Sequence, residues 1–156
     1  MNTKPRILFF ALFFAWAAPA TGESPVKLEA AEPWAPHPKA APVTAQRGEA
    51  FTVEANGTRT CSGGWQWRFD GIVPGRTYEI STVVAHRDVA VLGDAISCLA
   101  IWGAPEPGQA RPGATWDFLL PEPAGPGLVR YSRQLVAPAG ATRRCTTRSV
   151  SWRPSA

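Results

Sequence analysis

Among the residue types of this 156-residue chain, tryptophan has the most potential for ligand binding, and the chain contains seven tryptophans. Sugar rings present C–H patches that stack on aromatic faces, and their hydroxyls need planar polar partners. Trp102 ends an apolar run and Trp116 follows a long Pro/Gly-rich stretch, so both are candidates for stacking. Gln66, Arg68 and Asp70 alternate with aromatic residues and are candidates for bonding hydroxyls. Core packing is the competing role for each tryptophan, because aromatic side chains in strands are usually buried.

Catalytic groups are harder to find in the sequence. Catalysis needs a nucleophile beside a base, a carboxylate pair or a metal cluster. His86-Arg87-Asp88 places a histidine near an acid, a pattern for which a surface ion pair is the ordinary explanation. Ser62 lacks the Gly-x-Ser-x-Gly context of a nucleophile elbow, and aspartates could pair only through proximity in the fold: Asp70, Asp88, Asp94 and Asp117. We therefore expect a protein that is not an enzyme and uses no cofactor.

Three cysteines, Cys61, Cys98 and Cys145, are too widely spaced for the close pairs of a structural zinc site. In an oxidising compartment one pair can form a disulfide and one cysteine is left over, and the sequence does not choose among the three pairings. No loop has the acidic pattern of an EF-hand, although a structural calcium ion of another kind stays open. We expect no metal centre built from these cysteines.

The first twenty residues have the three regions of a secretory signal peptide. Lys4 and Arg6 precede an apolar run, and Ala18-Pro19-Ala20 follows it, so we predict cleavage after Ala20. A retained membrane anchor is the alternative, but the run is shorter than the roughly 20 residues of a spanning helix. The mature protein is then secreted or periplasmic, with no membrane span.

The mature chain of 136 residues, 156 minus the first 20, suits a single domain. Its net charge falls from +4 to +2 when Lys4 and Arg6 leave, which is too small to indicate nucleic-acid binding. Arginines are nevertheless concentrated after Glu122, where an anionic polymer could bind, although exported proteins commonly carry solvated arginines. Residues 21–48 are rich in proline and alanine and are predicted to be an extended linker, so the domain is residues 49–156.

Short runs of β-branched and aromatic residues alternate with turn signals through that domain. They predict strands over residues 49–55, 65–70, 77–85, 95–102, 115–120, 128–136 and 143–152. Such strands at such spacing predict an all-β antiparallel sandwich. Alternation makes Trp65, Trp67 and Phe69 core candidates, and it places a second set on one face of the next strand: Tyr78, Ile80, Thr82 and Val84.

Two stretches carry a resemblance to a known class of domain. Trp67-Arg68-Phe69, followed by Val73-Pro74-Gly75-Arg76-Thr77-Tyr78-Glu79-Ile80-Ser81, resembles the central signature of secreted carbohydrate-binding-type jelly rolls of the galactose-binding-like class. The region from Leu128 to Ala141, with its Pro138-Ala139-Gly140-Ala141 turn, is similar to their penultimate region. The resemblance implies a jelly roll over about residues 49–152. In this class the strand after the turn is usually followed by a last strand that pairs back into the sheet, whereas this sequence stops at Ala156, so a short or missing last strand is expected here.

The resemblance implies an exported, non-catalytic module that recognises a glycan or polysaccharide, an anionic one included. Trp102 and Trp116 would stack on sugar, and Gln66, Arg68 and Asp70 would bond hydroxyls. A different class of function is an interaction or structural module of the cell envelope, docking a protein partner at an exposed sheet edge. A third is a truncated accessory domain of a secreted hydrolase, because the fold class also supplies such domains without a sugar site.

Overall fold

The computed structural model describes residues 6–15, 26–89, 91–103, 115–139, 141 and 144–149. Regular structure in this part of the chain is almost entirely antiparallel β-strand, as the sequence predicts. A six-stranded sheet, sheet A, has the order β3-β4-β1-β6-β10-β9, and a five-stranded sheet, sheet B, has the order β2-β5-β11-β7-β8. Helical structure in the described residues consists of the 3-10 turn η1 (Pro38–Ala40) and the single turn α1 (Leu92–Ala95).

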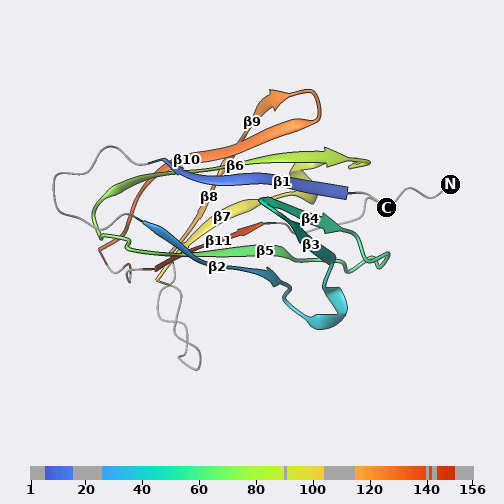
Figure 1. The fold of residues 1–156 in the computed structure, drawn as a ribbon, viewed down its shortest axis with the longest axis horizontal. Helices are drawn as coiled ribbons and strands as arrows, with labels where there is room; N and C mark the ends of the chain where they lie inside the picture. The colour runs from blue at the N-terminus through green and yellow to red at the C-terminus, as the bar shows by residue number, and fades with distance from the viewer. Residues whose placement is uncertain are drawn as a thin grey trace.

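Figure 1 shows the strands of the two sheets. Sheet A consists of β1 (Arg6–Ala15), β3 (Val43–Arg47), β4 (Ala50–Glu54), β6 (Thr77–Arg87), β9 (Leu120–Gly125) and β10 (Leu128–Val136). Sheet B consists of β2 (Lys27–Trp34), β5 (Gly64–Asp70), β7 (Cys98–Trp102), β8 (Thr115–Phe118) and β11 (Arg144–Ser149).

Most predicted strands are present at the predicted positions, but two of them differ from the prediction in where they begin or end. The strand expected over residues 95–102 begins only at Cys98, because α1 occupies Leu92–Ala95. The strand expected over 115–120 is divided at Leu119, whose side chain is buried and whose amide donates to the Cys98 carbonyl oxygen at 2.9 Å. The chain therefore passes from sheet B to sheet A at this residue. Residues 150–152 of the predicted last strand lie outside the described residues.

The linker expected over residues 21–48 is wrong for its described part, because this part contains β2, η1 and β3. Both strands lie at sheet edges, β2 in sheet B and β3 in sheet A. Proline is tolerated on an edge strand, where one side of the backbone needs no ladder hydrogen bond. Pro33 therefore fits within β2, where it pairs with Trp65, and proline content alone did not exclude a strand.

One hydrophobic cluster contains side chains from both sheets. Trp65, Trp67 and Phe69 of β5 are at most 5% exposed, which confirms the face predicted by alternation. Phe51 of β4 meets the Trp65 and Trp67 rings edge to face, with centroids 4.9 and 5.4 Å apart. The second predicted set is equally buried: Tyr78, Ile80, Thr82 and Val84. The edge-to-face contacts of Phe51 with the two tryptophans add stability beyond area burial.

Residues 6–15, which contain most of the apolar run of the expected signal peptide, form β1 between β4 and β6 (Figure 1). The neighbouring residues 1–5 and 16–25, which include the predicted cleavage site, lie outside the described residues. Cleavage therefore stays a prediction. Across the described chain, no helix has the length and apolar character needed to cross a membrane.

Candidate ligand-binding face

Backbone register brings most of the predicted site residues to one face of sheet B. Gln66 and Arg68 alternate with the buried aromatic residues of β5, so they lie on the opposite face of this strand. Through β11 and β7, the register connects Gln66 to Phe118 in one row and Arg68 to Trp116 in the next. We call this surface the polar–aromatic face, defined by Glu32, Gln66, Arg68, Trp116 and Phe118.

The polar half of this face is organised around Glu32. Its Oε1 accepts hydrogen bonds from Gln66 Nε2 at 2.7 Å and from Arg68 Nη2 at 2.6 Å. Glu32 reaches this position because β2 pairs with β5 in a register that sets Glu32 opposite Gln66. The Arg68 and Glu32 side chains are 34% and 45% exposed, so solvent screens the pair while both groups stay accessible. The arrangement presents fixed donor and acceptor groups on the sheet surface.

The aromatic half lies on β8, the edge strand of sheet B. The side chains of Trp116 and Phe118 are 49% and 56% exposed, and their register partners on β7 are Ile101 and Leu99. Three strand spacings separate β5 from β8, so the polar and aromatic halves are about 14 Å apart. A ligand that contacts both halves must therefore be extended.

Trp102 does not join this face, and its predicted stacking role is corrected by its burial. The residue is 1% exposed and lies within the hydrophobic cluster, with its ring centroid 6.3 Å from that of Tyr78. Its indole Nε1 donates to Asp117 Oδ2 at 3.0 Å, which satisfies the polar atom of a buried tryptophan. The ring offers no free face to a sugar.

Asp70, the last predicted site residue, is exposed at the end of β5 and pairs in register with Lys27 and Arg144. It lies at the margin of the polar–aromatic face, two residues beyond Arg68 along β5. Two residues of the face were not predicted from the sequence. Glu32 lies in the Pro/Ala-rich segment that the sequence predicts to be a linker, whereas Phe118 carries a usable signal, since it alternates with Trp116 around Asp117.

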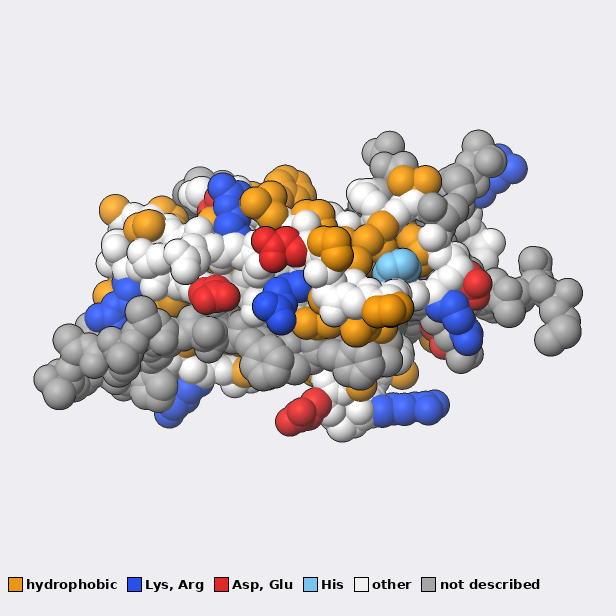
Figure 2. All heavy atoms as spheres, turned by 90° about the horizontal axis from the view of Figure 1, so that it is seen from above, with side chains coloured by type: hydrophobic (Ala, Val, Ile, Leu, Met, Phe, Trp, Pro, Cys, Tyr) orange, Lys and Arg blue, Asp and Glu red, His pale blue; other side chains and the backbone are white. Residues whose placement is uncertain are grey.

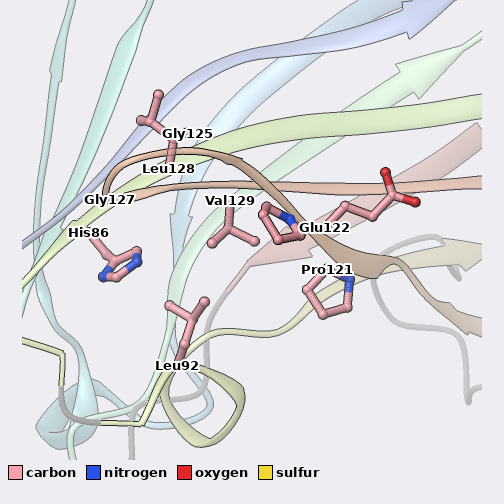
Figure 3. Close-up of a pocket in the computed structure, with 9 residues that line it drawn as sticks. His86, Leu92, Pro121, Glu122, Gly125, Gly127, Leu128 and Val129 are labelled. Carbon is pink, nitrogen blue, oxygen red and sulfur yellow. The ribbon is translucent and has the colours of Figure 1, made fainter.

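A second surface feature is an open pocket of about 360 Å³ beside the β9–β10 hairpin (Figure 3). His86 of β6, Leu92 of α1 and Val129 of β10 line it, together with prolines and glycines of the hairpin. Figure 2 shows hydrophobic side chains gathered near a histidine on the face seen from above. Glu122 also lines the pocket, but its carboxylate points away from His86 in Figure 3. The pocket thus offers an apolar surface and an imidazole without an oriented acid.

Asp88 has an arginine partner, and the two cysteine side chains that the structure describes are buried. Arg87 Nε lies 3.5 Å from Asp88 Oδ2, an exposed pair, so it is Arg87 and not His86 that contacts this aspartate. Cys61 and Cys98 are buried free thiols, and the Cys145 side chain is not among those described. Burial raises the pKa of Cys98 far above that of an ordinary thiol, which keeps it protonated and unreactive.

The described residues contain no group of three His, Cys, Asp or Glu side chains that could hold a metal ion. Comparison of the chain with protein-family models, with curated protein sequences and with solved structures found no match. Function is therefore inferred from the chemistry of the described surfaces.

Proposed function

We propose that this protein is an exported, non-catalytic β-sandwich of the jelly-roll type that recognises a glycan on its polar–aromatic face. The shared hydrophobic cluster supports the sandwich, because two sheets that bury one common set of side chains must pack through it. The observation that carries the function is the half-exposed Trp116 ring in the same cross-strand row as Arg68. An aromatic platform and fixed polar groups on one face of a sheet are the combination that sugar recognition needs.

The polar and the aromatic residues of the face have different roles in the proposed recognition. Glu32 holds Gln66 and Arg68 in place, so these side chains lose little rotamer freedom when a ligand binds. Trp116 and Phe118 supply apolar area for the C–H faces of the rings. The distance of about 14 Å between the two halves favours an oligosaccharide or polysaccharide over a monosaccharide.

A glycan-array screen of the exported protein tests the proposal, repeated at high salt to remove loose binding by arginines. We expect selective, salt-resistant binding that falls at least about tenfold in Trp116→Ala, the change produced by losing about 1.4 kcal/mol of contact. Val136→Ala is the matched control, because Val136 is a 60% exposed apolar residue on β10 in the other sheet. Binding to no glycan by folded protein contradicts the proposal.

The same screen separates the polar–aromatic face from the pocket. His86→Ala alters the pocket and leaves sheet B untouched, so this variant should bind glycan as the parent does. If His86→Ala loses binding while Trp116→Ala keeps it, the ligand occupies the pocket and the polar–aromatic face is not the site.

A further inference from the structure

β1 is an interior strand of sheet A, paired with a neighbouring strand on each side. β1 pairs antiparallel with β4, from Arg6 opposite Glu54 to Phe10 opposite Ala50. It also pairs antiparallel with β6, from Arg6 opposite Arg87 to Ala15 opposite Glu79. β4 and β6 therefore run parallel to each other with β1 between them (Figure 1).

β1 contains most of the apolar run of the expected signal peptide, which we call the leader. Cleavage after Ala20 would remove β1 and leave a gap in sheet A, with the β3–β4 hairpin on one side and β6-β10-β9 on the other. Both borders of the gap would then expose unpaired backbone N–H and C=O groups, a geometry that promotes pairing with another strand. We call this gap the β4–β6 slot, bordered by Ala50–Glu54 and Glu79–Arg87.

Sheet B shows how the equivalent position is filled when the chain supplies its own strand. β5 and β7 border a position that β11 occupies, antiparallel to both. β4 and β6, each one strand earlier in the sequence, border the position that β1 occupies in sheet A. Of the strands that the structure describes, only β1 enters the β4–β6 slot. Removal of the leader would therefore leave no described strand in the β4–β6 slot.

We propose that the β4–β6 slot of the exported protein accepts an apolar strand from another polypeptide, and that β1 occupies this position only until the leader is removed. Main-chain pairing on both sides would provide affinity, and alternate side chains would provide specificity. One row of slot residues is buried: Phe51, Val53, Ile80 and Val84. Residues of the other row are half-buried or exposed, as at Thr52 and Glu79.

These rows define the chemistry of the incoming strand. It runs antiparallel to β4 and β6, and it carries apolar residues opposite the buried row, at the positions that Ile7, Phe9 and Phe14 hold in β1. The register of β1 against β6 shifts between Phe10 and Leu12, which is why Phe14, and not an odd-numbered residue, stands opposite Ile80. Small or polar residues suit the alternate positions. A shift of one residue would exchange the two rows, so the register of the incoming strand is specified.

The test uses the protein recovered from a secreting host, whose N-terminus is first identified by intact mass. A synthetic peptide with the Arg6–Ala15 sequence, flanked by lysines for solubility, is then added and followed by native mass spectrometry and thermal unfolding. We expect a one-to-one complex with a raised Tm. A peptide carrying Ile7→Pro and Phe9→Pro is the control, because proline removes ladder hydrogen bonds, and it should neither bind nor stabilise.

Register is tested by disulfide trapping. A Leu8→Cys peptide should cross-link to a Thr52→Cys protein at least tenfold more than to a Glu54→Cys protein, because Leu8 pairs with Thr52 and Arg6 pairs with Glu54. Equal cross-linking at the two positions overturns the proposal that a strand pairs in the β4–β6 slot with this register. If the exported chain is unfolded alone, the peptide is added during refolding, and recovery of the fold supports the proposal.

Three other outcomes overturn the proposal. Retention of residues 6–15 in the exported protein would make β1 a permanent strand. A dimer that does not bind the peptide would assign the slot to a second copy. A folded monomer that does not respond to the peptide would show that the slot is closed or filled from within the chain. Glycan binding on sheet B is measured on the same samples and can fail independently.

Discussion

Two tryptophan-bearing strands of sheet B have similar sequences and opposite roles. In β5, Trp65-Gln66-Trp67 turns its aromatic row into the hydrophobic cluster, where Trp67 is 2% exposed. In β8, Trp116-Asp117-Phe118 turns its aromatic row outward, where Trp116 is 49% exposed. On the other face of β8, Asp117 accepts the Trp102 indole hydrogen bond. Alternation thus defines two faces of a strand, and the tertiary partners decide which one is buried.

Replacing one buried and one exposed tryptophan with alanine tests this contrast most directly. Trp102→Ala should lower the free energy of unfolding by about 3–5 kcal/mol, because it leaves a cavity and an unpaired Asp117 oxygen. Trp116→Ala should change it by less than about 0.5 kcal/mol, the usual effect at an exposed site. Urea unfolding of both variants measures the difference. Equal losses would show that Trp116 belongs to the core and would remove it from the ligand-binding face.

Gly63, just before β5, extends the comparison to the backbone at the edge of the core. Its φ is +137°, and a Cβ there would collide with the Trp34 carbonyl oxygen and lie 2.9 Å from Pro42 Cδ. Gly63→Ala should therefore cost more than about 2 kcal/mol, since strain and overpacking add. Gly75 has a φ of +77° with open space around it, so Gly75→Ala should cost only about 1 kcal/mol. Chemical unfolding of the two alanine variants gives the ranking.

Alkaline pH should weaken the core. Burial, followed by the charge of nearby Cys98, raises the pKa of Tyr131 to about 12 from an ordinary 10.0, and burial also raises the pKa of Cys98. The folded state thus holds these protons more tightly than the unfolded state, so stability is full below about pH 9 and falls as pH rises toward 12.

Tyr131→Phe is the matched variant for this pH dependence. It loses the hydroxyl bond to the Ile96 carbonyl oxygen, at a cost of about 1 kcal/mol near neutral pH. It should also lose less stability than the parent between pH 10 and 12, because one of the titrating groups is gone. Thermal unfolding across this range measures both effects, and parallel curves for variant and parent would contradict the assignment to Tyr131.

The smallest expected effect is at the Glu32–Arg68 pair. Glu32→Gln removes the charge and keeps the shape, and it should lower stability by at most about 1 kcal/mol because the pair is partly exposed. Glycan binding should fall several-fold in the same variant, since a neutral amide oxygen holds the Gln66 and Arg68 donors less tightly than the Glu32 carboxylate does. A variant with lower stability and unchanged affinity would limit Glu32 to a structural role.

The linker prediction failed for a reason that the same strands explain. Composition describes average preferences, and the proline and alanine of residues 21–48 favour an extended chain. An extended chain is also what an edge strand requires, so β2 and β3 could form once β5 and β4 offered free edges. Glu32 entered the candidate site through this pairing and could not have been placed by spacing alone.

The sequence by itself determined the local features: the β class, the positions of β4, β5, β6 and β10, and the buried rows of β5 and β6. These follow from side-chain alternation and turn residues, which act over a few positions. Only the tertiary structure decided that Trp102 is buried, that Trp116 is exposed and that Glu32 meets Arg68. These outcomes depend on strand order and register between distant segments, and a local pattern carries no information about which strands become neighbours.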